Sequence, residues 1–370
     1  MKFKCSKLNL LNSVQIVSKA VPSSTTMSIL ECILIEAVDN RIKLTANDSE
    51  LGIETYIDAE VKEEGSVAIE AKMLLEVVRK LPDDNVDFVI DEDLIANITC
   101  GKSKFKINCK DGSDFTLLPN IEKNEPIIIS QMALRDIIRQ TIFSIGVNDA
   151  NKVMSGLYLV INNDSLKITA LDGHRIAIRK VQLKNVYDAK DVIIPGKTLG
   201  EIAKIISGGA EDDISIYITD NHILFEFDNT LVLSRLIEGK YFSVDKMMSS
   251  DYETKLTVNK KDLYDCIDRS MLFSKEGNKK PIVLEVADSN LKVKVTSSLG
   301  SFDEDIDIDK NGKDIRIGFN PKFISDALKV IDDENIDIYF VNSKAPCYIK
   351  DENENYIYLI LPVNLNNLNY

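Results

Sequence analysis

Histidine is scarce in this sequence: only His174 and His222 occur among 370 residues. A metal site built from several histidines is therefore excluded. The six cysteines include no Cys-x-x-Cys pair and are scattered along the chain, as Cys5, Cys32, Cys100, Cys109, Cys266 and Cys347. This spacing is typical of buried free thiols in a reducing compartment, and not of zinc ligands or disulfides. We expect neither a metal nor a cofactor.

Long apolar runs and an excess of basic residues are missing too. No stretch reaches the roughly 20 apolar residues that a membrane helix needs, and Met1–Cys5 lacks the apolar run of a signal peptide. We therefore expect a cytoplasmic protein with no membrane partner. The 45 basic and 59 acidic residues give a net charge of −14. Because the chain as a whole repels nucleic acid, binding to DNA requires a local basic surface.

What the sequence does contain is a three-fold internal repeat. Apolar residues spaced i, i+3, i+4, i+7 form one helix face in Leu74–Leu81, and the same face recurs in Leu199–Ile206 and Ile324–Ile331. The copies lie about 125 residues apart, a length typical of one domain. We therefore predict three homologous domains, at residues 1–124, 125–251 and 252–370.

Each domain is expected to be internally doubled, as a strand, a helix and several strands that occur twice. A second helix face, Leu134–Ile145, matches Leu263–Ser270 and, more loosely, Leu10–Val17. Later strands alternate apolar and polar residues, as in Ile214–Ile218, so one face of each sheet should pack on helices. The fold class is therefore α+β, with six helices expected at Ser6–Ala20, Ala71–Leu81, Gln131–Ile145, Gly196–Ser207, Asn259–Lys275 and Pro321–Ile331.

Positive charge is concentrated on these six helices. Together they carry about +8, which leaves about −22 on the rest of the chain. This distribution predicts a helical surface that contacts DNA phosphates loosely and without reading sequence. For any single residue, an ordinary solvated helix face is the alternative. The cations that we expect to face DNA are Lys72, Arg79, Lys80, Arg135, Arg139, Lys197, Lys204 and Arg269.

Two segments of opposite charge stand apart from the helices. Gly101–Lys110 contains four lysines and no acid, whereas Ser301–Asp309 contains five acids and no base. We expect the two segments to meet across a subunit boundary, because complementary charge sets orientation and register. The alternative is that each is an exposed edge strand that its own charges protect against aggregation.

Catalytic motifs are weak. The segment Gly196–Thr198 resembles the end of a phosphate-binding loop, but Asp191 stands where that loop needs its first glycine. Asp172 and His174 are close enough in sequence to orient each other, yet no G-x-S-x-G nucleophile elbow accompanies them. We therefore expect no enzymatic activity, and a hydrolase built on Asp172 and His174 is one alternative function.

Four segments, together with the repeats, resemble a known family. They are the opening Met1-Lys2-Phe3, the motif D-G-H-R-I-A within Ala170–Ala177, Ile317–Asn320 and the late Leu361-Pro362-Val363. In combination they are similar to the bacterial DNA polymerase III beta subunit, the replicative sliding clamp, over essentially the whole chain. The D-G-H-R-I-A motif is specific to this family. The L-P-V motif is weak by itself but becomes a strong signal at its location near the chain end.

The resemblance implies a DNA clamp fold. That fold is a head-to-tail homodimeric ring of six similar domains, with helices lining the hole and sheets outside. Such a ring encircles double-stranded DNA without sequence specificity and gives the replicative polymerase its processivity. Repair polymerases, ligase and the clamp loader are further partners, which bind through short linear motifs. The family is non-catalytic and needs no cofactor.

The resemblance also implies two sets of contact residues. A hydrophobic pocket for the linear motifs lies between the second and third domains near the chain end, at Met154, Leu171, Gly173, His174, Arg175, Ile176, Phe242, Lys246, Met247, Asn320, Phe323, Lys344, Pro346, Leu359, Leu361, Pro362, Val363 and Leu365. The dimer contact joins Lys102, Lys104, Phe105, Lys106 and Ile107 of one subunit to Leu272, Phe273, Asp303, Glu304 and Asp305 of the other.

Some positions depart from the family pattern. Phe242 stands where many relatives have proline, which reshapes one subsite, and Asn364 replaces a usual basic residue. Ser24 replaces an arginine that contacts DNA in relatives, and the chain continues through Asn366–Tyr370 where others stop. A peptide-binding scaffold that never encircles DNA is the second alternative function.

Overall fold

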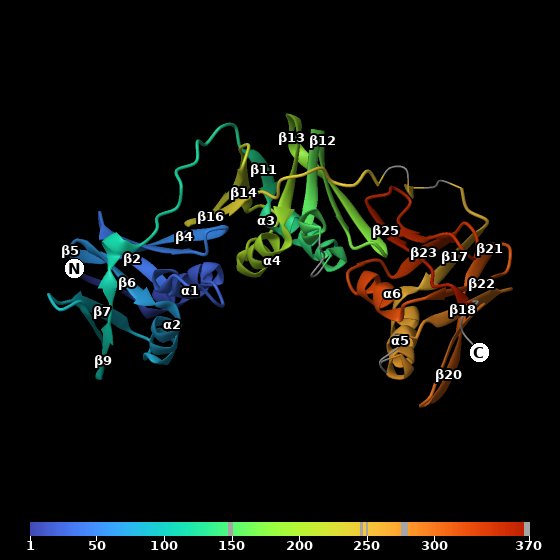
Figure 1. Cartoon of the computed structure of the whole chain (residues 1–370), viewed down its shortest axis with the longest axis horizontal. Coiled ribbons are helices and arrows are strands. Elements are labelled where there is room, and N and C mark those ends of the chain that lie inside the picture. Colours follow the sequence, from blue (N-terminus) through green and yellow to red (C-terminus); the bar gives the residue numbers. More distant parts are fainter. Residues whose placement is uncertain (147–150, 245–246, 249–250, 275–279, 366–370) are drawn as a thin grey trace. The chain divides into compact units, whose positions relative to one another are not determined.

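The structure, a computed structural model, describes residues 1–146, 151–244, 247–248, 251–274 and 280–365 (Figure 1). By internal packing the chain divides into two compact units, Met1–Met132 with Glu201–Leu236, and Ala133–Gly200 with Ile237–Tyr370. No helix in the described part of the chain is long and apolar enough to cross a membrane. The domain boundaries expected after residues 124 and 251 stay a prediction.

The first repeat has the doubled pattern of strand, helix and strands. Its first half is β1 (Lys2–Ser6), α1 (Lys7–Val17), β2 (Cys32–Val38), β3 (Arg41–Asn47), β4 (Leu51–Asp58) and β5 (Glu60–Glu63). Its second half is β6 (Gly65–Glu70), α2 (Ala71–Lys80), β7 (Asn85–Ile90), β8 (Ile95–Cys100), β9 (Ser103–Asn108) and β10 (Lys110–Asp111).

The second repeat has the same order, with two long strands at its centre. It comprises β11 (Ile127–Ser130), α3 (Gln131–Arg139), β12 (Gly156–Leu171), β13 (Arg175–Pro195), α4 (Gly196–Ile205), β14 (Asp213–Ile218), β15 (His222–Phe227) and β16 (Thr230–Arg235). The 21-residue β13 ends the first half of the repeat and leads directly into the helix of the second half.

The third repeat completes the series. Its first half is β17 (Thr254–Asn259), α5 (Lys260–Ser270), β18 (Ile282–Ala287), β19 (Asn290–Ser297), β20 (Gly300–Asp307) and β21 (Asp309–Gly312). Its second half is β22 (Ile315–Phe319), α6 (Pro321–Leu328), β23 (Asn335–Phe340), β24 (Cys347–Lys350) and β25 (Tyr356–Ile360). The predicted α+β fold of three doubled repeats is therefore confirmed.

Antiparallel sheets carry the chain from one repeat to the next. One unit holds the sheets β5-β1-β7-β8-β9 and β10-β6-β2-β3-β4-β16-β15-β14-β11, in which β4 of the first repeat pairs with β16 of the second. The other unit holds β12-β13-β25-β24-β23-β17-β21 and β20-β19-β18-β22, in which β13 of the second repeat pairs with β25 of the third.

All six predicted helices are present and begin within one residue of the expected position. The sequence overestimated some of their lengths. Short 3₁₀ turns follow three of them, at Ser18–Ala20, Ile142–Ser144 and Met271–Phe273. After α3 the Thr141 hydroxyl donates to the Ile137 carbonyl at 2.7 Å, so a side chain satisfies a helix-end acceptor there. α6 begins with Pro321, which directly follows the N-cap residue Asn320. The Asn320 side chain accepts a hydrogen bond from Lys322 N–H.

The predicted apolar helix faces form the cores. In the third repeat, α5 and α6 pack with both sheets of their unit around one cluster, to which Leu263, Ile267, Ile324 and Leu328 contribute. Of the predicted face residues, Ile145 and Ala203 are only half-buried. All six cysteines are free thiols, and burial raises the pKa of Cys5, Cys266 and Cys347 to about 12. The predicted free thiols are thus confirmed, and five of the six are buried, whereas Cys109 is half-buried.

A buried arginine links the second and third repeats beside the β13–β25 pairing. Arg175, 7% exposed, donates from Nε to Asp172 at 2.9 Å and from Nη1 to Asp326 of α6 at 2.7 Å. Its Nη2 donates to the Phe143 carbonyl at 2.6 Å, and its Cζ lies 4.6 Å from the centre of the Phe323 ring. The guanidinium therefore binds groups from both repeats, out of water, where breaking such an arrangement is costly.

Replacing Arg175 with alanine should destabilise the protein strongly. The change leaves Asp172 and Asp326 partly buried without their shared cation, at a cost of about 3 kcal/mol. Lys322→Ala is the matched control, because Lys322 binds the same Asp326 at 2.6 Å but is 65% exposed, so its loss should cost less than about 1 kcal/mol. Urea unfolding followed by circular dichroism measures both variants. Equal, small shifts of the two midpoints would contradict the assignment of Arg175 as the link.

Candidate functional site

One face of the seven-stranded sheet carries a continuous apolar row. Strand register places five residues opposite one another across β12, β13, β25, β24 and β23, namely Leu171, Ile176, Leu359, Tyr348 and Tyr339. Residues that face each other across antiparallel strands point to the same side of the sheet. All five are buried in one hydrophobic cluster. Both the second and third repeats contribute to this surface.

The connection after Ile237 covers the apolar row. Tyr241 and Val244 are buried in the same cluster, and the Tyr241 hydroxyl donates to the Thr169 carbonyl at 3.2 Å. The Tyr348 hydroxyl donates to the Met247 carbonyl at 2.9 Å. Phe242 and Met247 are nevertheless 41% and 52% exposed. Their backbone is held in place while their side chains remain available to a partner.

The segment after β25 adds two more exposed apolar side chains. Leu361 N–H donates to the His174 carbonyl at 2.9 Å, and Val363 N–H donates to the Gly318 carbonyl at 2.8 Å. Leu361 is 38% exposed and Val363 is 36% exposed. A Cβ at Gly318 would lie 2.5 Å from Leu365 Cδ2 and 3.2 Å from the Val363 carbonyl oxygen, so a larger residue there would displace the Leu365 side chain.

The Asp172–His174 turn is occupied by structural contacts. Asp172 Oδ1 accepts from the backbone N–H groups of His174 and Arg175, and its Oδ2 accepts from Arg175 Nε. Gly173 has φ +82°, a left-handed conformation that favours glycine. The His174 ring stacks on Phe323 with centroids 5.9 Å apart. Among the described residues, Asp172 thus orients Arg175 rather than the His174 ring, which removes the support for a hydrolase.

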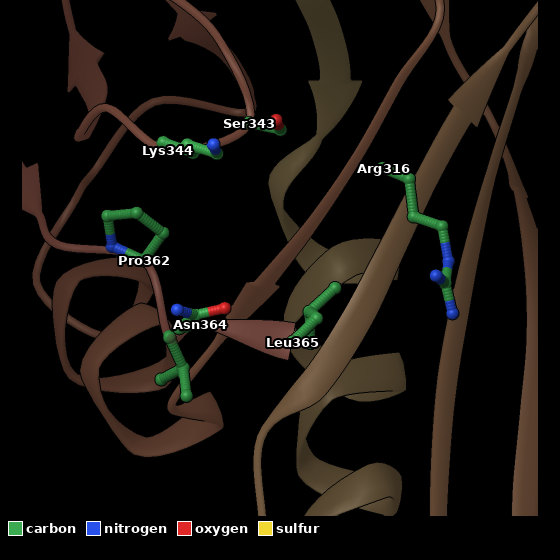
Figure 2. Close-up of a pocket in the computed structure, with 7 residues that line it drawn as sticks. Arg316, Ser343, Lys344, Pro362, Asn364 and Leu365 are labelled. Carbon is green, nitrogen blue, oxygen red and sulfur yellow. The ribbon is translucent and has the colours of Figure 1, made fainter. Parts of the chain in front are cut away.

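A cavity of about 470 Å³ opens beside the segment that follows β25 (Figure 2). It is lined by Arg316, Ser343, Lys344, Pro362, Val363, Asn364 and Leu365. Four of these residues belong to the predicted pocket, and Asn364 had been singled out as a departure from the family pattern. Arg316 and Ser343 were missed. Arg316 lies on β22, two residues before Gly318, so the Gly318–Val363 contact brings it to the site.

The predicted pocket residues that the structure describes all fall within one compact unit, at different depths. Leu171, Arg175, Ile176 and Leu359 are buried, and Met154, Asn320, Phe323, Pro346, Pro362 and Leu365 are half-buried. Gly173, His174, Phe242, Met247, Lys344, Leu361 and Val363 are exposed, and Lys246 lies outside the described residues. The buried members lie beneath the exposed apolar members, which form an apolar surface. Their assignment to partner binding stays a prediction.

The predicted DNA-facing cations lie on helices, and ion pairs engage at least four of them. Arg135 and Arg139 are half-buried, and the other six are exposed, namely Lys72, Arg79, Lys80, Lys197, Lys204 and Arg269. The pairs are Arg79–Glu76, Lys204–Glu201, Arg139 with both Asp136 and Asp332, and Arg269–Glu304. Exposed pairs of this kind contribute little to stability and exchange readily. Arg139 differs, because it also donates to the Val330 carbonyl at 3.2 Å and thus has a structural role.

The two segments of opposite charge form sheet edges. Among the described residues, β9 and β20 each pair on one side only. Lys102, just before β9, and Lys104 and Lys106 on it are exposed, while Phe105 is half-buried and Ile107 is buried. On and near β20, Asp303, Asp305 and Leu272 are exposed, while Glu304 and Phe273 are half-buried. Leu272 is 61% exposed, whereas Phe273 packs against the core of the third repeat. Both edges thus combine charge with apolar surface.

Comparison with known proteins agrees with this architecture. Three family models match in succession: the DNA polymerase III beta subunit N-terminal domain over residues 1–119, its central domain over residues 128–243 and its C-terminal domain over residues 246–364. The beta sliding clamp of Staphylococcus epidermidis is 33% identical, across 98% of this chain and 99% of its own length. The beta sliding clamp of Staphylococcus aureus has the same identity and coverage.

Solved structures give the same result. A crystal structure from Eubacterium rectale assigned to the DNA polymerase III beta subunit is 57% identical, with a TM-score of 0.95, and the match covers 98% of this chain and 100% of that one. The DNA polymerase sliding clamp of Bacillus subtilis also has a TM-score of 0.95, at 33% identity over 98% of this chain and 99% of its own. The chain therefore belongs to the DNA polymerase III beta subunit family, the bacterial beta sliding clamps.

Proposed function

We propose that this chain is a DNA sliding clamp of the bacterial cytoplasm. It encircles duplex DNA without sequence specificity and tethers the replicative polymerase, which gives that enzyme its processivity. The match of all three beta-subunit domains, in order and over nearly the whole chain, carries this conclusion. The clamp performs no catalysis itself, in keeping with a family whose members are accessory subunits of the polymerase.

Ring closure by two subunits is supported by the charges of the free edges. Pairing β9 with a second β9 would bring lysines together, and pairing β20 with a second β20 would bring carboxylates together. Pairing β9 of one subunit with β20 of the other joins opposite charges and extends both sheets. This contact is head-to-tail, and such contacts close into a ring when the rotation permits. Two chains of three repeats then supply six domains.

DNA contact is assigned to the helices. Lys72 and Lys80 on α2, Lys197 on α4 and Arg135 on α3 are candidates for phosphate contacts. Arg79 and Lys204 can exchange an exposed carboxylate partner for a phosphate at little cost. Few, exchangeable contacts suit a protein that must move along DNA, because sequence-independent binding depends on backbone charge alone.

Partner docking is assigned to the surface formed by Phe242, Met247, Leu361 and Val363. These exposed apolar side chains come from two chain segments, and both segments are bound by hydrogen bonds to the sheet beneath. Methionine and leucine provide adaptable contacts for a short extended peptide, while backbone groups fix its register. Polymerases, the clamp loader and ligase are the proposed partners.

Removing the apolar part of the subunit contact should give monomers. The double variant Leu272→Ala with Phe273→Ala loses the apolar anchors, so light scattering should report about 41.5 kDa instead of twice that mass. Because Phe273 also packs in the core, Leu272→Asp serves as a second variant that leaves Phe273 in place. Val186→Ala, at an exposed position on β13, is the control and should remain dimeric. An unchanged dimer mass in both Leu272 variants would overturn this interface.

Short clamp-binding peptides should bind to the surface at the chain end. A labelled peptide of the Gln-Leu-x-Leu-Phe type is titrated with the protein and followed by fluorescence anisotropy. Leu361→Ala should weaken binding about tenfold, because it removes a central apolar contact. Leu117→Ala, which removes a leucine that is 60% exposed in the other compact unit, should bind like the unchanged protein. Equal affinities for all three proteins would place the docking site elsewhere.

A further inference from the structure

The cavity beside the late segment has an unusual charge for this protein. Its seven lining residues include two cations, Arg316 and Lys344, and no acid, although acidic residues outnumber basic ones by 59 to 45 in the whole chain. Figure 2 shows Lys344 and Ser343 on one side of the space and Arg316 on the other, with Leu365 between them. The lining is therefore positively charged, although the chain as a whole is acidic.

The two cations retain positive charge after their local contacts are counted. Lys344 is exposed, and no carboxylate among the described residues forms an ion pair with its Nζ. Arg316 Nε donates to Glu285 at 3.1 Å, but the same carboxylate also accepts from Lys294 Nζ at 2.6 Å. Lys294 and Arg316 hold the pKa of Glu285 below its ordinary value, so Glu285 stays ionised. The single negative charge of Glu285 is thus shared between Arg316 and Lys294, so it does not fully neutralise Arg316.

Three of the other five lining residues are apolar, and this apolar part of the wall is continuous with the docking surface. Pro362, Val363 and Leu365 line the cavity, and Val363 is also one of the exposed apolar residues of the docking surface. A free phosphate would pair with the cations but leave these apolar side chains uncovered. A peptide that carries an acidic side chain next to its apolar residues satisfies both parts of the wall, because charge complementarity adds to apolar burial.

We propose that this cavity selects partners whose docking peptide has a glutamate or aspartate beside its apolar residues, with Lys344 as the main contact and Arg316 as the second. The inference rests on the proposed docking function and adds a preference among docking peptides. Lys344 is a specificity-determining residue on this account. The contribution is modest, because the charges are partly solvated, and it weakens as salt screens them.

Two peptide pairs test the proposal. Each pair shares a Gln-Leu-x-Leu-Phe core, and its members differ only by Glu or Gln, placed before the core in one pair and after it in the other. Anisotropy titrations use the full-length protein and its Lys344→Gln and Arg316→Gln variants. Lys313→Gln is the matched control, because it removes one exposed positive charge of the third repeat outside the cavity.

In one of the two pairs, the Glu peptide should bind about three- to fivefold more tightly than the Gln peptide at low salt. This advantage should disappear in Lys344→Gln, shrink in Arg316→Gln and at high salt, and persist in Lys313→Gln. Equal binding within both pairs, or an advantage that survives Lys344→Gln, would overturn the inference while leaving the docking function intact. Absence of binding by all four peptides would overturn the docking function and the inference together.

Discussion

Backbone pairing between strands of successive repeats is the constraint on which the rest of this structure depends. β4 pairs with β16 within one compact unit, and β13 pairs with β25 within the other. A strand edge presents unpaired N–H and C=O groups that favour further pairing. These two joints satisfy edges inside the chain, whereas β9 and β20 keep free edges among the described residues. Their opposite charges favour pairing with each other on different subunits over pairing with copies of themselves.

The same constraint creates the docking surface. Because β25 lies against β13, residues of the third repeat continue the apolar row that begins on β12. Arg175 reinforces this joint from one side by binding Asp172 and Asp326, and Leu361 N–H extends the pairing to the His174 carbonyl. The polar residues of the D-G-H-R motif therefore act as structural supports. In the proposed docking surface, partner contacts fall to the exposed apolar side chains that these supports hold in place.

Local periodicity predicted the repeats and the six helices well. An apolar face such as Leu74–Val78 depends only on residues close in sequence, so it can be recognised without knowledge of the fold. Ion pairs between distant residues, such as Arg269 with Glu304, gave no such signal, and they offset part of the positive charge counted on the helices. Arg316 was missed for the same reason, since only the contact between Gly318 and Val363 brings β22 to the cavity. Family resemblance supplied the remaining pocket residues.

Topological linkage to DNA tests the central claim most directly. The protein is assembled on a nicked circular plasmid with a bacterial clamp loader, and the complex is isolated by gel filtration. Part of it is then cut once with a restriction enzyme and filtered again. A closed ring without sequence-specific contacts should stay with the circle and leave the linear DNA by sliding off its ends. Equal retention on circular and linear DNA, or retention on neither, would contradict the account.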